Sequence, residues 1–184
     1  MGLKIVGGAA KGRKLRGPKT DQIRPATSRV RKSIFDILGD LSGRHILDLF
    51  AGTGSMGLEA LSRGAESVSF VDSGQAAISL LFKNLEAIGF RERSRVLKKN
   101  ASAAVELLSK KGLRFDIIFL DPPYDRGLVD ATLRKINRFP LLADDGLIVC
   151  EHSPRELPTF LDGLQKEDFR KYGQTLVSFL KGKA

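Results

Sequence analysis

The sequence predicts an α/β protein built on an open, mostly parallel sheet that helices cover on both faces. Apolar runs alternate with helical patterns five times along the 184 residues, and such alternation is typical of parallel sheets. The last two apolar runs follow each other with only a turn between them, so these strands must be antiparallel neighbours. We therefore expect seven strands, with one antiparallel strand near an edge of the sheet.

The expected elements follow from hydrophobic spacing and from glycine positions. Strands are predicted over residues 45–50, 67–72, 95–97, 115–120, 146–151, 169–172 and 175–180. Helices are predicted up to residue 41, up to residue 63, and over about 77–88, 101–108, 128–139 and 156–164. Gly64 and Gly89 are placed to end two of them. The first helix, capped by Thr27 or Ser28, has an apolar face formed by Val30, Ile34, Ile37, Leu38 and Leu41.

The positive charge of the chain is concentrated at its N-terminus. Residues 1–32 hold ten basic side chains and one acidic one, whereas the whole chain holds 31 and 21. A polyanion, above all nucleic acid, explains this distribution, and a solvated tail is the alternative. Gly7 and Gly8 between two short extended runs predict a β-hairpin arm over residues 1–22, followed by one domain over residues 23–184. The candidate nucleic-acid contacts are Lys11, Arg13, Lys14, Arg24, Arg29 and Arg31, the last two expected to reach outward toward phosphate.

Cysteine content and hydropathy indicate the cellular compartment in which the protein is expected. The single cysteine, Cys150, lies in an apolar run, which indicates a buried thiol and excludes an internal disulfide. The first ten residues hold no apolar segment long enough for a signal peptide, and no later segment is long enough to span a bilayer. We expect a cytoplasmic monomer without membrane association and without a metal site.

The chain is organised around a glycine loop that follows the first strand. Gly52, Gly54 and Gly57 form a G-x-G-x-x-G pattern at the start of a helix, which on its own suggests a dinucleotide site. Asp48 lies four residues before the first glycine, where a carboxylate would repel a pyrophosphate and attract a cation. S-adenosylmethionine carries a sulfonium and an ammonium and has no phosphate, so the loop favours this cofactor over NAD.

Two further polar residues end neighbouring strands. Asp72 closes the second strand and is placed to accept hydrogen bonds from a ribose, which both cofactors carry; capping of the next helix is the alternative. Asn100 follows the third strand, where it either contacts an adenine edge or caps a helix. Because ligands bind at the carboxyl ends of strands in such sheets, we expect these residues to converge with Asp48 and Asp121 on one crevice.

The fourth strand runs into Asp121-Pro122-Pro123-Tyr124. Two prolines fix the backbone and remove two N–H donors, which leaves the Asp121 carboxylate and the Pro122 carbonyl as rigid acceptors. Such acceptors suit a base with an exocyclic amine that stacks on Tyr124, at about 1–3 kcal/mol per base. Holding both amine hydrogens would aim the nitrogen lone pair at a sulfonium methyl, and orientation can contribute about 7–11 kcal/mol. A tight strand-exit turn is the alternative.

Together these motifs resemble the bacterial methyltransferases that act on a guanine N2 of small-subunit (16S) ribosomal RNA. The resembling stretches are residues 24–27, 29–31, 48–54, 57–65 and 121–124. The resemblance implies the Rossmann-like fold of class I methyltransferases that depend on S-adenosylmethionine, and an RNA substrate for the basic arm. Asp72 and Asn100 depart from the family pattern, in which a Glu and an acid are usual. The candidate catalytic residues are Asp121, Pro122, Pro123 and Tyr124, and the candidate cofactor-binding residues are Asp48, Phe50, Ala51, Gly52, Gly54, Asp72, Asn100 and Ala101.

Other functions stay open at the level of sequence. The Asp-Pro-Pro-Tyr motif specifies an exocyclic amine and no particular base, so methylation of adenine N6 in DNA or another RNA is the alternative. A NAD-dependent oxidoreductase is disfavoured by Asp48, and His45 and His152 are interpreted as satisfied surface residues. A non-catalytic RNA-binding module is a further hypothesis. For the favoured function we expect 16S ribosomal RNA within a small-subunit particle as partner, its phosphates held by the arm and by the basic residues 91–99 while the target base is extruded.

Overall fold

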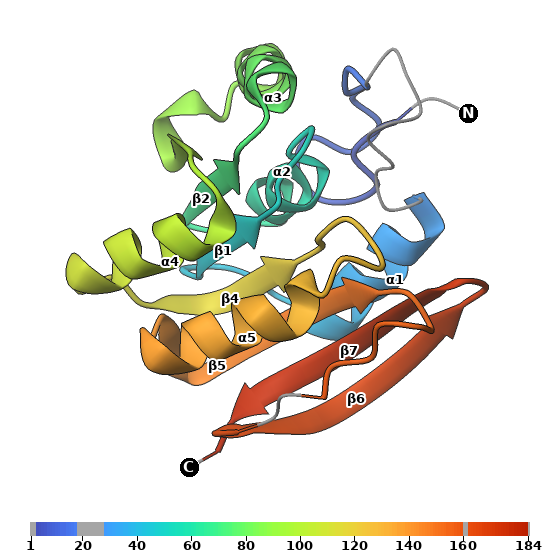
Figure 1. Cartoon of the computed structure of the whole chain (residues 1–184). Coiled ribbons are helices and arrows are strands. Elements are labelled where there is room, and N and C mark those ends of the chain that lie inside the picture. The colour runs from blue at the N-terminus through green and yellow to red at the C-terminus, as the bar shows by residue number, and fades with distance from the viewer. Residues whose placement is uncertain (1–2, 18–27, 160–161, 184) are drawn as a thin grey trace. The chain divides into compact units, whose positions relative to one another are not determined.

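The computed structural model describes residues 3–17, 28–159 and 162–183 (Figure 1). The chain divides into two compact units, Met1–Lys98 and Lys99–Ala184. The predicted cap at Thr27 and the candidate Arg24 lie outside the described residues. The division into an arm over residues 1–22 and a domain over residues 23–184 stays a prediction.

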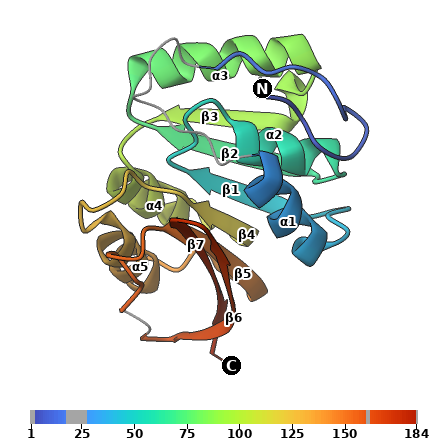
Figure 2. The same cartoon turned by 90° about the vertical axis from the view of Figure 1, so that its right-hand side faces the viewer.

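Among its described residues, the first unit holds three parallel strands and the helices that connect them. Strands β1 (His45–Leu49), β2 (Ser67–Asp72) and β3 (Ser94–Lys98) pair in the order β3-β2-β1. Helices α2 (Ser55–Ser62) and α3 (Gln75–Ile88) connect them, and the 3-10 helix η1 (Arg91–Arg93) precedes β3. Figure 2 shows α3 running beside β3, which it contacts. Glycines at positive φ follow the two helices at Gly64 and Gly89, as predicted.

Helix α1 (Ser28–Leu38) corrects part of the predicted apolar face. Val30 and Ile34 are buried as expected, and Phe35 is also fully buried. Ile37, assigned to the buried face, is 41% exposed. The buried residues of α1 are Val30, Arg31, Ile34 and Phe35, so the buried face is rotated from the predicted one and position 37 lies at its edge.

The N-terminal arm packs on the first unit instead of forming a regular hairpin. Lys4 and Lys14 make one antiparallel bridge, flanked by backbone hydrogen bonds such as Leu15 N to Leu3 O at 2.9 Å. This ladder is too short to form strands over the predicted runs. Ile5 and Leu15 are nevertheless buried, at 0% and 6% exposure. Residues 3–17 are therefore held by apolar burial as well as by backbone pairing.

Among its described residues, the second unit holds four strands and two helices. Strands β4 (Phe115–Leu120), β5 (Leu142–His152), β6 (Leu164–Tyr172) and β7 (Thr175–Gly182) lie in the order β4-β5-β7-β6. β4 and β5 are parallel, and β7 is antiparallel to both β5 and β6. Helices α4 (Ala101–Lys110) and α5 (Leu128–Arg138) lie side by side (Figure 1). The predicted antiparallel strand is thus β7, and Cys150 of β5 is buried as expected.

The helix predicted over residues 156–164 is wrong for the residues that the structure describes there. Residues 154–159 form turns and irregular backbone, and residues 162–163 form a turn. The polar groups of this segment bond to the start of α5, since Glu156 accepts from Val129 N at 3.4 Å and Thr159 N donates to Asp130 at 2.9 Å. Pro158 also disfavours a helical conformation of the residue before it. Across the described ranges, no helix combines the length and the apolar content needed to cross a membrane.

Candidate active site

The glycine loop between β1 and α2 adopts a left-handed backbone at three positions. Gly52 and Gly54 have φ of 56° and 79°, which glycine adopts without steric cost. Phe50 has φ of 64°, a conformation that is rare for a residue with a bulky side chain. Strain of this kind costs about 1–3 kcal/mol and gathers at ligand-binding segments. The residues of this loop therefore adopt the backbone conformation that the loop requires, even where that conformation is locally unfavourable.

The third glycine of the pattern serves packing. Gly57 lies inside α2, and a Cβ added to it would meet the Phe70 ring on β2 at 2.2 Å and Val68 Cγ1 at 2.8 Å. No real Cβ contact is that short, so α2 can approach β2 only with glycine at this position. The close approach fixes where α2 begins relative to the loop. The backbone conformation thus requires glycine at positions 52 and 54, and packing requires it at position 57.

The Asp48 side chain is buried next to the glycine loop and is not open to solvent. Its side chain is 2% exposed, and Oδ2 accepts a hydrogen bond from Gly57 N at 2.9 Å. The amides in the first turn of a helix lack intrahelical partners and favour a negative charge. Burial raises the pKa of Asp48 to about 7, the Gly57 hydrogen bond opposes this rise, and Asp72 adds to it. A contact between Asp48 and the cofactor stays a prediction.

Asp72 braces the other side of the loop. Its Oδ2 accepts from Gly52 N at 2.8 Å, and its Oδ1 accepts from Gly74 N at 2.8 Å. Gly74 is the N-cap residue of α3, which has no side-chain cap hydrogen bond, so Asp72 bonds to the start of this helix without capping it, and the capping alternative is not observed. The ribose contact stays a prediction.

Asn84, which the sequence interpretation missed, joins the loop to the arm. This α3 side chain is fully buried, and its Nδ2 donates to Thr53 O at 2.9 Å and to Arg16 O at 3.1 Å. Its Oδ1 accepts from Arg16 N at 2.8 Å. A polar residue on the apolar face of a helix was the available signal, because a buried amide requires hydrogen-bond partners.

The residues after β3 begin the second unit. Asn100 is the N-cap of α4, and its Oδ1 accepts from Ala103 N at 2.8 Å. Ala101 is buried at the first position of that helix. The capping alternative for Asn100 is therefore observed, and the adenine contact stays a prediction. Asp48 and Asp72 belong to the first unit and Asn100 and Asp121 to the second, so their meeting in one crevice also stays a prediction.

The Asp-Pro-Pro-Tyr segment leaves β4 directly at its end. Asp121 is half-buried, Pro122 is buried and Pro123 is exposed. The half-buried Tyr124 donates its hydroxyl to Glu151 Oε1 at 2.8 Å, and its oxygen lies 3.3 Å from Thr175 Oγ1. Burial, followed by the charge of Glu151, raises the pKa of Tyr124. The phenol is thus a protonated, tethered donor.

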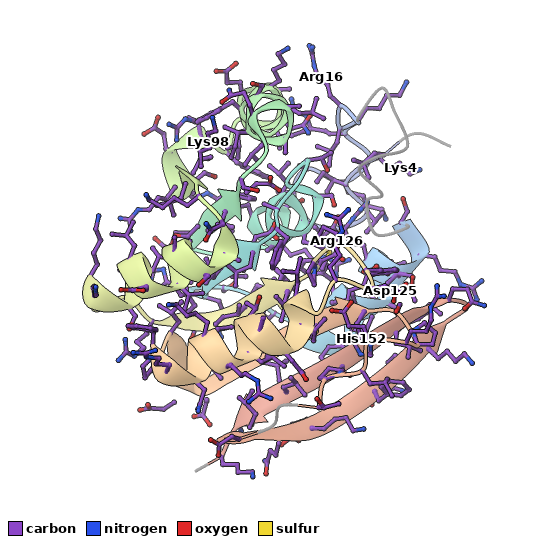
Figure 3. The ribbon with its side chains drawn as sticks, in the orientation of Figure 1. Lys4, Arg16, Lys98, Asp125, Arg126 and His152 are labelled. Carbon is purple, nitrogen blue, oxygen red and sulfur yellow. The ribbon has the colours of Figure 1, made fainter. Side chains whose placement is uncertain are left out.

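The residue after Tyr124 is fixed by the segment that follows β5. Asp125 has φ of 58°, and its amide donates to Glu156 Oε2 at 2.6 Å. Its carboxylate accepts from Ser153 Oγ at 2.6 Å and lies 3.1 Å from Arg155 Nη2. Figure 3 shows Asp125 and Arg126 together on this loop. None of these partners was among the predicted site residues.

The two histidines have different surroundings. His45 is exposed and contacts Ser67 Oγ at 2.8 Å, as interpreted. His152, interpreted as a surface residue, is fully buried, and its Nε2 lies 2.9 Å from Ser178 Oγ on β7. Burial lowers the pKa of His152. An imidazole enclosed between strands and bonded on both nitrogens has a structural role.

The candidate nucleic-acid contacts separate into exposed and engaged side chains. Lys11, Lys14 and Arg29 are exposed. Arg13 donates to Ala87 O and Ile88 O at the C-terminal end of α3, where a cation also complements the helix dipole. Its first role is therefore to fasten the arm to α3.

Arg31 corrects the expectation of an outward-reaching arginine pair. Its side chain is fully buried, donates to Lys4 O, and lies 3.6 Å from Glu59 Oε2. Glu59 is also buried, accepts from Val6 N at 2.8 Å, and pairs with Arg63 at 3.0 Å. A buried charge needs such partners, so Arg31 holds the arm and α1 on α2. Arg29 is the member of the pair that remains at the surface.

The basic residues 91–99 are also partly engaged inside the unit. Arg93 donates to Ala65 O at 3.0 Å, Arg91 donates to Ser94 O at 3.0 Å, and Lys98 donates to Gln75 Oε1 at 2.6 Å. Lys98 and Arg16 are labelled in Figure 3. Phosphate binding by this cluster stays a prediction.

Comparison with known proteins places these features in a family. The family model described as "Conserved hypothetical protein 95" matches residues 3–181. The chain is 37% identical over 181 residues to the putative rRNA methyltransferase YlbH of Bacillus subtilis, covering 97% of this chain and 98% of the relative. It is 38% identical over 159 residues to ribosomal RNA small subunit methyltransferase D of Escherichia coli, covering 85% and 78%.

A solved structure confirms the predicted fold class. The putative methyltransferase yhhF from Escherichia coli matches with a TM-score of 0.87 and 33% identity, covering 99% of this chain and 98% of that chain. The predicted Rossmann-like, mostly parallel α/β fold with seven strands and one antiparallel strand is therefore correct. The β-hairpin form of the arm is the part of that prediction that is not confirmed.

Proposed function

Because this chain belongs to the family described as "Conserved hypothetical protein 95", we propose that it transfers a methyl group from S-adenosylmethionine to the N2 amine of a guanine in 16S ribosomal RNA. The family membership confirms the resemblance drawn from the glycine loop and the Asp-Pro-Pro-Tyr motif. Methylation of ribosomal RNA accords with relatives named as rRNA methyltransferases. The base and the atom that receive the methyl group are the finer part of the proposal.

One observation carries the proposal: β4 ends in a rigid set of acceptors that is followed at once by an anchored aromatic ring. The Asp121 carboxylate and the Pro122 carbonyl are acceptors on a backbone that two prolines stiffen. Tyr124 is tethered through its hydroxyl, and its ring is the surface on which we propose that the base stacks. This combination fits an exocyclic amine on a planar base.

The glycine loop fits the cofactor. Gly52 and Gly54 supply the left-handed backbone of the loop, and Phe50 is held there in a strained conformation. Asp72 fixes the loop through Gly52. When bound, S-adenosylmethionine supplies an electrophilic methyl group on a positively charged sulfur. The residues that would hold it in this unit are Asp48, Phe50, Ala51, Gly52, Gly54 and Asp72.

The chain contributes orientation to the reaction more than acid–base strength. Asp121 and the Pro122 carbonyl accept the two amine hydrogens, so the nitrogen lone pair is directed away from the ring plane. With S-adenosylmethionine bound, this nitrogen would accept the methyl group, and the electron pair of the broken C–S bond would remain on sulfur. The methylated nitrogen then releases one proton, for which the Asp121 carboxylate is the acceptor within the motif. Orientation of this kind can contribute about 7–11 kcal/mol.

The exposed cations of the arm support an RNA partner. Lys11 and Lys14 are exposed on an arm that Ile5 and Leu15 anchor by burial, so they project from a fixed base. Such side chains neutralise phosphates and make affinity depend on salt. We propose that the partner is 16S ribosomal RNA within a small-subunit particle, and that the enzyme acts as a monomer.

The test is methyl transfer from labelled S-adenosylmethionine to small ribosomal subunits, free 16S ribosomal RNA and DNA, followed by mass analysis of the nucleosides. We expect N2-methylguanosine in the ribosomal RNA. N6-methyladenine in DNA, or in RNA, would instead support the alternative that the motif leaves open. An Asp121→Ala variant is the control that separates transfer by this site from a contaminating activity.

A further inference from the structure

The hydroxyl of Tyr124 is held by two residues from different strands. It donates to Glu151 Oε1 at 2.8 Å, near the end of β5, and lies 3.3 Å from Thr175 Oγ1, the first residue of β7. Glu151 and Thr175 are 8% and 9% exposed. A phenylalanine would offer the same ring for stacking, so the hydroxyl of this residue needs another explanation.

The hydrogen bond to Glu151 is of the strong type. A hydroxyl that donates to a buried carboxylate is charge-assisted, and an enclosed carboxylate requires such a donor. Burial and the negative charge of Glu151 both raise the pKa of Tyr124. The phenol therefore remains protonated and able to donate throughout the neutral range.

The backbone next to the ring is fixed from the same side. Asp125 takes a left-handed conformation with φ of 58°, while Glu156 and Ser153 bond to its amide and its carboxylate at 2.6 Å. The ring and the backbone that carries it are thus both attached to β5 and the segment that follows it. Surroundings that fix a strained residue twice over are typical of functional loops.

We propose that Glu151 and Thr175 are positioning residues that hold the Tyr124 ring in the orientation on which the target guanine stacks. This inference rests on the proposed function and adds to it two residues outside the Asp-Pro-Pro-Tyr motif. A ring that is held in advance loses little freedom when the base arrives, and the amine is then presented to Asp121 at a fixed depth. Glu151 and Thr175 act through Tyr124 and touch no substrate.

The kinetic test compares Glu151→Ala, Glu151→Gln, Thr175→Val and Tyr124→Phe in methyl transfer to ribosomal RNA. Misplacement of a reacting group can cost about 100-fold in rate, so we expect Glu151→Ala and Tyr124→Phe each to lower kcat by about 10- to 100-fold. The affinity for S-adenosylmethionine should not change. Glu151→Gln, whose amide oxygen still accepts the hydroxyl, should retain activity within about threefold of wild type. Thr175→Val should have a smaller effect than Glu151→Ala because its contact is longer.

A double variant shows whether the two side chains act as one unit. If Glu151 acts through the tyrosine hydroxyl, Glu151→Ala combined with Tyr124→Phe should be no slower than the slower single variant. Losses that multiply would overturn the proposal, and so would a Glu151→Ala enzyme with wild-type kcat. Glu167→Ala, which removes an exposed carboxylate on β6, is the matched control and should be neutral.

A spectroscopic test does not depend on activity. The chain has two tyrosines and no tryptophan, so a Tyr172→Phe variant leaves Tyr124 as the single phenol. Its phenolate absorbance should appear above the ordinary tyrosine pKa of 10.0, with circular dichroism recorded to follow the fold. Adding Glu151→Gln should move the titration to lower pH, and an unchanged titration would overturn the tether.

The two tests separate failure of the inference from failure of the proposed function. An enzyme that methylates no guanine in ribosomal RNA disproves the proposed function and the guanine-positioning role together, whatever the titration shows. An enzyme that does so, but in which Tyr124→Phe and Glu151→Ala have wild-type kcat, disproves the positioning role alone.

Discussion

The glycine loop after β1 and the Asp-Pro-Pro-Tyr segment after β4 both leave a buried parallel strand, but different groups stiffen them. In the first loop, backbone amides donate to carboxylates, from Gly57 to Asp48 and from Gly52 to Asp72. In the second segment, prolines remove backbone N–H donors, and side-chain hydrogen bonds hold the segment, chiefly the one from the Tyr124 hydroxyl to Glu151. The first loop is therefore fixed through its backbone, by Asp48, Asp72 and Asn84, and the second is fixed through side chains from β5 and β7.

This difference matches the ligands that we propose for the two segments. A cationic methyl donor suits a loop that is held by the Asp72 carboxylate, because opposite charges attract. An amine with two hydrogens to donate suits a segment from which competing N–H donors have been removed. The variants below test each half of this comparison, beginning with the largest expected effect.

Replacement of Asp121 by alanine should affect the second segment alone. Loss of one preorganised hydrogen-bonding group at a reacting centre typically costs about 100- to 1,000-fold in kcat. We expect a loss of that size in labelled methyl incorporation into ribosomal RNA, with unchanged S-adenosylmethionine affinity by calorimetry. Loss of cofactor binding in Asp121→Ala would show that the two segments do not have separate roles.

The pH dependence of stability should report on Asp48 in the first loop. Burial raises its pKa from 3.8 to about 7, so between about pH 4 and pH 7 the folded chain holds a proton that the unfolded chain has lost. The free energy of unfolding should therefore fall as the pH rises through this window. Each unit of pKa shift corresponds to about 1.4 kcal/mol, so the free energy of unfolding should fall by on the order of 4 kcal/mol across this window.

Asp48→Asn is the matched variant, because its amide oxygen can still accept from Gly57 N. Chemical denaturation between pH 4 and pH 8 should show a flatter stability profile for this variant than for wild type. A wild-type profile that does not fall in this window, or an equal slope in the variant, would mean that the Asp48 carboxylate is not desolvated beneath the loop.

Gly57→Ala tests the packing under the same loop. The added Cβ would meet the Phe70 ring at 2.2 Å and Val68 Cγ1 at 2.8 Å, and overpacking of this kind costs about 1–3 kcal/mol. Denaturant unfolding should show that loss. Gly17→Ala, where an added Cβ meets nothing within 4 Å, is the control and should stay within about 0.5 kcal/mol of wild type.

The same contrast explains which parts of the molecule the sequence could predict. The glycine loop is a local pattern: its strand, its glycines and its two acids lie within residues 45–72, so the run of residues is enough to identify them. Tyr124 was also identified by its motif. Its partners lie 27 and 51 residues farther along the chain, at strand ends whose proximity depends on the order of β4, β5 and β7. No spacing rule indicates such pairs.

Two of the incorrect predictions have the same origin. The helix dipole disfavours a cation in the first turn of a helix, so Arg31 was expected to reach outward toward phosphate. It is instead buried against Glu59, which lies on α2. The helix predicted over residues 156–164 had acceptable local spacing, yet Glu156 is engaged by amides of another segment. In each case a tertiary contact outweighs a local preference, because it satisfies a polar or charged group that would otherwise be unpaired.

The smallest expected effect concerns the surface pair beside the second segment. Asp125 lies 3.1 Å from Arg155, whose side chain is 83% exposed, and exposed ion pairs contribute about 0–1 kcal/mol. Asn tolerates the left-handed conformation found at this position and keeps an oxygen that can accept from Ser153. Asp125→Asn should therefore change the free energy of unfolding by no more than about 0.5 kcal/mol and leave kcat near wild type. Asp125→Ala, which removes both the acceptor and the tolerance of positive φ, should lower both the free energy of unfolding and kcat by more than Asp125→Asn does. Equal effects of the two variants would show that the charge of Asp125, and not its backbone conformation and hydrogen bond, fixes this end of the segment.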